Sequence, residues 1–123
     1  MRRLVDRRRR VVTGLPPLVD ILRGSVVVRT LRCGKRGCRC ADGEGHRATY
    51  LSVSFAGRRT VQISVPPDLV PLAQRQVANY RAWWNAIEEV SAINRDLLRA
   101  ERQKRVARKR SERQRARGQR TRS

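Results

Sequence analysis

The chain has 123 residues, of which 30 are Lys or Arg and 10 are Asp or Glu, so its formal net charge is +20. Only five residues are aromatic, and a chain this short with so few large apolar side chains builds one small domain with a limited core. No apolar run reaches the roughly 18–20 residues that cross a bilayer, and no apolar segment of a signal peptide follows the basic start. We therefore expect a cytoplasmic protein with no membrane segment and a polyanionic partner.

A basic N-terminal arm is expected over residues 1–14. Its first ten residues carry six arginines against one acidic residue, Asp6. Because the guanidinium group matches phosphate oxygens bidentately, we expect these side chains to contact nucleic acid. They are Arg2, Arg3, Arg7, Arg8, Arg9 and Arg10.

A folded α+β domain is expected over residues 15–98. Residues 25–32 are rich in β-branched side chains, which predicts a strand. Residues 50–55 and 59–65 alternate apolar and polar side chains, so each predicts a strand with one buried face. The short link Ala56-Gly57-Arg58 joins them as a hairpin. The sequence therefore predicts a small three-stranded antiparallel sheet, with residues 33–48 inserted after its first strand.

All three cysteines and the single histidine lie in that insertion, within residues 33–46. Zinc takes four nitrogen or sulfur ligands in a tetrahedron, and three Cys with one His is a common structural set. The expected ligands are Cys33, Cys38, Cys40 and His46, and the cationic neighbours that would offset thiolate charge are Lys35, Arg36, Arg39 and Arg47. An odd number of cysteines gives no disulfide framework. Two alternatives stay open: a glycine-rich loop without metal, and a redox pair formed by Cys33–Cys38 or Cys38–Cys40.

One long C-terminal helix follows the sheet. Pro66-Pro67 end the last strand, Asp68 is a good N-cap, and Pro71 falls in the first turn, where no backbone hydrogen bond is lost. Apolar residues then recur at helical spacing from Leu72 to Leu98, without an intervening Gly or Pro. This apolar stripe is longer than a small sheet covers. Its surplus packs either on residues 15–22 or on a second copy of the helix, which would make a homodimer.

Residues 99–123 form an Arg-rich tail or an extension of that helix. They carry twelve basic residues against Glu101 and Glu112. Such a block is often a solvated arm that contacts polyanions, and we expect it to order when phosphates neutralise it. The alternative is a merely solvated end. The residues expected to bind nucleic acid are Arg99, Arg102, Lys104, Arg105, Arg108, Lys109, Arg110, Arg113, Arg115 and Arg117.

A family resemblance begins at Gly24-Ser-Val-Val. It continues through Cys33-Gly-Lys-Arg-Gly-Cys-Arg-Cys, His46 and Tyr50-Leu to Asn79-Tyr-Arg on the helix. Over residues 24–98 the chain resembles a family of small bacterial and archaeal proteins that is known as a domain of unknown function, often encoded near transposases. The resemblance implies the same Cys/His constellation and a link to a mobile element.

These features favour a nucleic-acid-binding accessory protein over an enzyme. The acidic residues show no catalytic pairing, and the chain lacks a phosphate-binding glycine loop and a nucleophile elbow. We expect no small-molecule substrate, and contacts to DNA or RNA mainly through phosphates. The alternative is a zinc-stapled, dimeric protein-interaction module whose basic ends only keep it in solution.

Overall fold

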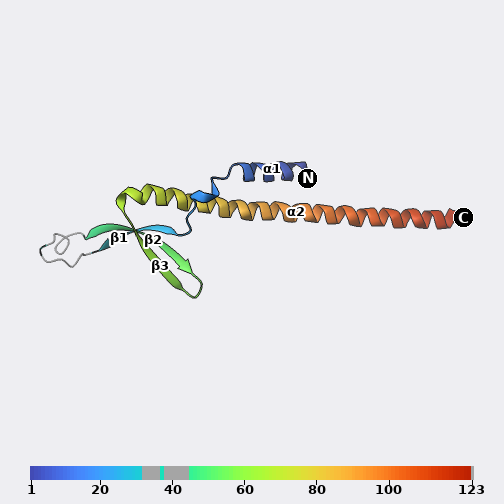
Figure 1. Ribbon diagram of the computed structural model, residues 1–123. Helices are drawn as coiled ribbons and strands as arrows, with labels where there is room; N and C mark the ends of the chain where they lie inside the picture. The colour runs from blue at the N-terminus through green and yellow to red at the C-terminus, as the bar shows by residue number, and fades with distance from the viewer. Residues whose placement is uncertain (32–36, 38–44, 123) are drawn as a thin grey trace. The chain divides into compact units, whose positions relative to one another are not determined.

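The computed structural model describes residues 1–31, 37 and 45–122 (Figure 1). It has the predicted α+β architecture, a three-stranded antiparallel sheet followed by one long C-terminal helix. The predicted Cys/His loop lies almost entirely outside the described residues. In chain order the elements are α1 (Arg2–Thr13), the 3₁₀ turn η1 (Leu18–Asp20), β1 (Ser25–Leu31), β2 (His46–Phe55), β3 (Arg59–Val65), the 3₁₀ turn η3 (Pro67–Leu69) and α2 (Val70–Arg122).

The sheet has the order β1-β2-β3 with both neighbours antiparallel. Val26 pairs with Leu51, which in turn pairs with Ile63, so these three apolar residues share one face of the sheet. Strand β2 is longer than predicted because its ladder with β1 runs on to the pair Leu31 and His46. Residues 46–49 lack the apolar alternation that marked the rest of β2, so the sequence pattern did not reveal them.

Residues 56–58 join β2 to β3, as the sequence predicts. Phe55 and Arg59 form the closing pair, and the loop takes positive φ at two successive residues, 79° at Gly57 and 62° at Arg58. Glycine adopts this left-handed region at little cost, whereas an arginine there is uncommon. Of the two residues of this turn with positive φ, only the first is therefore a glycine.

The chain divides into two compact units. The first, called here the sheet unit, is Pro16–Trp84; the second, the helical unit, combines Met1–Leu15 with Asn85–Ser123. In the sheet unit the buried core is formed by Leu51 and Val53 of β2 and Val77 of α2. Partly buried side chains pack around this core: Leu22, Val26 and Val65.

The predicted long helix is α2, which continues to Arg122. It begins at Val70, directly after η3, and Asp68 lies within η3 rather than at the start of α2. Gly118 does not interrupt the helix. Basic residues crowd its last turns, where the partial negative charge of the helix C-terminus stabilises cations.

The N-terminal residues form a helix, α1, which the sequence reasoning treated only as a basic arm. Within the helical unit, α1 runs antiparallel to α2, since Arg8 contacts Asn94 while Val12 and Thr13 line one depression with Val90. Ala86 and Ile93 of α2 are buried. In α1, the residues that are not fully exposed lie along one side of the helix: Leu4, Val5, Arg8 and Val11. The surplus stripe of α2 is therefore covered in part by α1.

Two neighbouring tryptophans differ in their burial. Trp84 is 54% exposed, while Trp83 is half-buried. The indole Nε1 of Trp83 donates a 2.9 Å hydrogen bond to the carbonyl of Pro16. The buried residues of α2 in the sheet unit are Ala73 and Val77.

Candidate nucleic-acid interface

The C-terminal part of α2 is an exposed, strongly basic helix. Every residue from 101 to 120 is exposed. Residues 99–120 contain eleven Lys or Arg and only two acidic residues, Glu101 and Glu112. We call this segment the basic helix segment. It contains all ten of the C-terminal residues that the sequence predicts to contact phosphates, and it offers them in regular helical positions.

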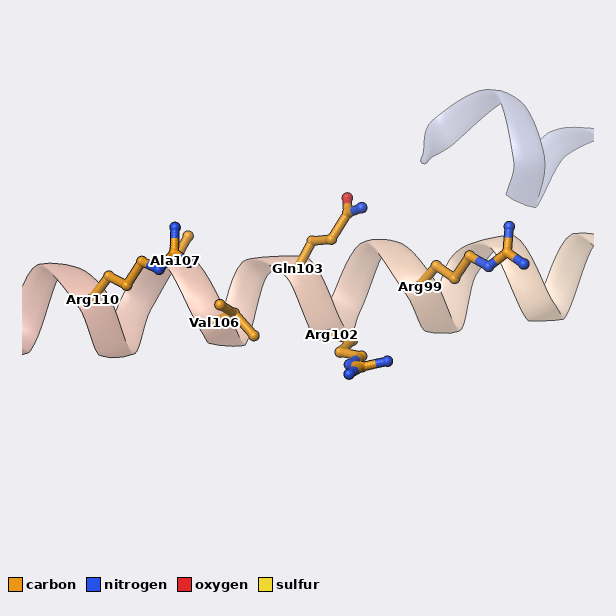
Figure 2. Close-up of a pocket in the computed structure, with 6 residues that line it drawn as sticks. All are labelled: Arg99, Arg102, Gln103, Val106, Ala107 and Arg110. Atoms are coloured by element: carbon orange, nitrogen blue, oxygen red, sulfur yellow. The ribbon is translucent and has the colours of Figure 1, made fainter.

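The charges are distributed unevenly around this segment. Successive residues turn by about 100° on an α-helix, so Glu101 and Glu112, eleven residues apart, lie on one line. Gln103 and Gln114 each follow a glutamate by two residues and therefore lie about 200° away, on the opposite side. In Figure 2 the side chains of Arg99, Gln103 and Arg110 project to one side of the helix, and all three line one shallow depression together with Arg102. The side without acidic residues is thus flanked by cations.

One ion pair of the basic helix segment joins two successive turns. Arg105 Nε contacts Glu101 Oε1 at 3.3 Å, one turn away, and both side chains are at least half exposed. Such a pair contributes only a few tenths of a kcal/mol, about as much as each like-charged pair one turn apart costs. Like-charged pairs are more numerous, among them Lys104–Arg108 and Lys109–Arg113. A polyanion that neutralises these cations would therefore stabilise the helix.

The N-terminal arginines divide into two groups. Arg7 binds Glu89 through Nε at 2.8 Å and Nη2 at 2.7 Å, and Arg8 donates to the side-chain oxygen of Asn94 at 2.7 Å. These two residues hold α1 on α2. The remaining arginines of α1 are exposed, namely Arg2, Arg3, Arg9 and Arg10. Because α1 is antiparallel to α2, its first residues point toward the basic helix segment.

The predicted zinc ligands are largely outside the described residues, namely Cys33, Cys38 and Cys40, as are Lys35, Arg36 and Arg39. The fourth ligand, His46, is exposed and begins β2, where its backbone pairs with Leu31. Arg47 follows it in β2 and is exposed. In the part of the chain that the structure describes, no group of three or more His, Cys, Asp or Glu side chains could hold a metal ion.

A polar cluster around Asp20 was not foreseen. The Asp20 carboxylate accepts hydrogen bonds from Arg75 Nε at 3.0 Å and Gln76 Nε2 at 3.0 Å, and its backbone carbonyl accepts one from Asn79 Nδ2 at 2.9 Å. Hydrogen bonding from Arg75, and then from Gln76, holds the pKa of Asp20 below its usual value. The backbone N–H of Leu22 donates to the carbonyl of Gln76 at 3.0 Å.

This cluster fixes residues 20–22 on α2 and has a structural role. The polar residues Arg75, Gln76 and Asn79 beside the apolar stripe indicate such a contact in the sequence. The sequence does not indicate that their partner is Asp20, 55 to 59 residues earlier in the chain.

Together these features define a small α+β protein that carries an exposed basic helix at one end of its chain. The chain belongs to the family described as a domain of unknown function (DUF6788), whose model matches residues 1–75. The match contains α1 and the whole sheet, and it ends near the start of α2, before the basic helix segment. It thus begins and ends earlier than residues 24–98, over which the sequence suggested a resemblance. Comparisons with curated proteins and with solved structures found no match. Within the described ranges, no helix is both long and apolar enough to cross a membrane.

Proposed function

We propose that this protein is a nucleic-acid-binding accessory protein, and that the basic helix segment of α2 is its main contact surface. The observation that carries the proposal is the exposure of residues 101–120 on every side of a helix with eleven cations in its 22 residues from 99 to 120. A helix with this composition has no apolar face to bury. A polyanion is the partner whose charge it matches.

The exposed arginines of α1 supplement this surface. Arg2, Arg3, Arg9 and Arg10 belong to the same compact unit as the basic helix segment. Contacts of this kind go to phosphates and carry little sequence information. The biological setting that the family resemblance implies, an accessory role beside a transposase, is part of the proposal. Co-purification with a transposase encoded nearby would test it.

Deletion of residues 99–123 tests the proposed surface. If about six of its cations contact phosphates at once, log Kd plotted against log salt concentration should rise with a slope of about five, since each phosphate neutralised on duplex DNA contributes about 0.9 to the slope. Affinity would then fall roughly 10³-fold between 50 and 200 mM salt. Full-length and truncated protein are titrated with a fluorescent 30-base-pair DNA, a hairpin RNA and a single strand over this range.

The truncated chain should lose most of the salt slope. It keeps α1, the sheet and residues 70–98 of α2, so its thermal unfolding should resemble that of the full chain. If it binds all three nucleic acids as tightly as the full chain, with the same slope, the basic helix segment is not the contact surface.

A second candidate function is a zinc-stapled protein-interaction module. It rests on the clustering of every cysteine and the only histidine into residues 33–46. We propose a structural zinc ion held by Cys33, Cys38, Cys40 and His46. Because the affinity of a structural site for its metal is also folding energy, a chelator should then destabilise the sheet. Metal analysis of freshly reduced protein should give about one zinc per chain, and a metal-free protein with an intact fold would contradict the site.

The dimeric form of this module would use exposed apolar residues of α2. Trp84 in the sheet unit and Ile87 in the helical unit are each 54% exposed. Val90 and Leu97 are partly covered. Sedimentation at tens of micromolar distinguishes the two functions, because the module requires a dimer and phosphate binding does not.

A further inference from the structure

We propose that the basic helix segment lies in the major groove of duplex DNA with one particular face toward the base edges. This face, called here the amide face, carries Gln103, Ala107, Ser111, Gln114 and Gly118. The inference rests on the proposed function and adds to it the form of the nucleic acid and the orientation of the helix.

The placement of the acidic residues sets the orientation. Glu101 and Glu112 lie about 200° around the helix from Gln103 and Gln114. A helix that presents the amide face to DNA keeps both carboxylates off the groove floor, because Glu101 and Glu112 lie beyond the cationic flank that ends at Arg108. The reverse orientation would bring both of them against the polyanion.

Cations flank the amide face on both sides. At 100° per residue, one flank holds Arg99, Arg110 and Arg117, and the other holds Lys104, Arg108 and Arg115. A groove has a phosphate backbone along each wall, so a helix inside it needs cations on two sides and a neutral face between them. The segment has this arrangement, and Figure 2 shows Arg99 and Arg110 on the same side as Gln103 and Ala107.

The dimensions favour DNA over double-stranded RNA. An α-helix with side chains is about 10–12 Å across, and the major groove of B-form DNA is about 12 Å wide. The major groove of A-form RNA is deep and narrow and does not admit it. From Gln103 to Gln114 the helix rises by about 16 Å, which spans roughly five base pairs at 3.4 Å each.

The residues of the amide face suit a groove floor. Glutamine can bond both the N6 and the N7 of adenine, and an alanine methyl group contacts the methyl group of thymine. Ala107 and Gly118 are small, so the backbone can approach the bases closely. An added Cβ at Gly118 would have no heavy atom within 4 Å.

Two double variants of equal charge test the orientation in the full chain. Gln103→Glu with Gln114→Glu puts two carboxylates on the amide face. Ala116→Glu with Gln119→Glu puts two on the side where Glu101 and Glu112 already lie. Both lower the net charge by two, and all four positions are exposed, so both should fold as the wild type does. Circular dichroism checks the helix content.

We expect the first pair to weaken binding to a 30-base-pair DNA at least tenfold, and the second pair less than threefold. Dimethyl sulfate interference locates the groove, since it methylates guanine N7 in the major groove and adenine N3 in the minor groove. Methylation at guanine N7 should inhibit binding, and methylation at adenine N3 should not.

The outcomes distinguish binding in the major groove from phosphate binding alone. Equal losses for the two pairs, or interference at adenine N3 alone, would overturn the groove assignment and leave phosphate binding intact. Tighter binding to a double-stranded RNA than to DNA of the same length would overturn it as well. If the wild-type chain binds no nucleic acid at 50 mM salt, the proposed function itself is wrong.

Discussion

Replacing Gly24 by alanine should greatly lower the temperature at which the sheet unit unfolds. Gly24 precedes β1 with φ at +144°, and an added Cβ would lie 2.9 Å from Leu51 Cδ1, 2.9 Å from the Ser52 carbonyl oxygen and 3.1 Å from Val53 Cγ2. Leu51 and Val53 are core residues, 4% and 8% exposed. Overpacking costs about 1–3 kcal/mol, and a strained backbone conformation adds about 1–3 kcal/mol. The total is about 2–6 kcal/mol.

Gly57→Ala is the matched control. Gly57 also has positive φ, at 79°, but nothing lies within 4 Å of the position of its Cβ. Its substitution therefore adds backbone strain alone, about 1–2 kcal/mol. Thermal unfolding is followed by tryptophan fluorescence, since Trp83 and Trp84 both lie in the sheet unit. Each kcal/mol lowers the Tm of a domain of this size by about 4–8 °C.

The difference between the two variants is the decisive quantity. We expect Gly24→Ala to lower the Tm by at least about 8 °C, and by more than Gly57→Ala does. If both variants unfold at the same temperature, Gly24 is not packed against β2 as described, and the argument from crowding fails.

Three further substitutions test the contacts that hold the chain segments on α2. Asp20→Asn should reduce stability at pH 7 but not in acid: the pKa of Asp20 is lowered in the folded state, so its contribution is complete above its ordinary value of 3.8 and is lost as the pH falls through the lowered value. Urea unfolding at pH 7 and at pH 2 measures this. Arg7→Gln should lower the free energy of unfolding by less than about 1 kcal/mol, because Arg7 and Glu89 form an ion pair at the surface. Trp83→Phe should cost about 1 kcal/mol, because the Pro16 carbonyl loses its donor, and a variant as stable as the wild type would refute that bond.

Local sequence patterns predicted most of the sheet and the course of α2. Strand β3 has the predicted bounds, because Val61, Ile63 and Val65 alternate with polar residues along its whole length. The start of β2 was missed, because its first four residues pair with β1 through backbone groups and show no alternation. Hydrogen bonds between strands do not depend on side-chain identity.

Helix α1 was missed for a different reason. Its high density of arginines suggested an arm, yet Leu4, Val5, Val11 and Val12 repeat after seven residues, which is a helical period. Charge and periodicity are independent signals, and in this segment they indicate different structures. The consequence extends to the candidate site, because Arg7 and Arg8 bind α2 rather than standing free for phosphate. Composition can count cations, but it cannot say which of them already have partners.

The division of the chain also sets an order of events during synthesis. The sheet unit is one continuous stretch, Pro16–Trp84, whereas the helical unit joins the first residues of the chain to a stretch that begins at Asn85. On the ribosome, α1 is therefore made first and waits for its partner. Arg8 and Asn94 are separated by 86 residues, so at about 5–20 residues per second the wait lasts roughly 4–17 s. The sheet unit is itself complete only once Trp84 has been made, shortly before Asn94, so for most of that interval the apolar side of α1 has no helix to pack on.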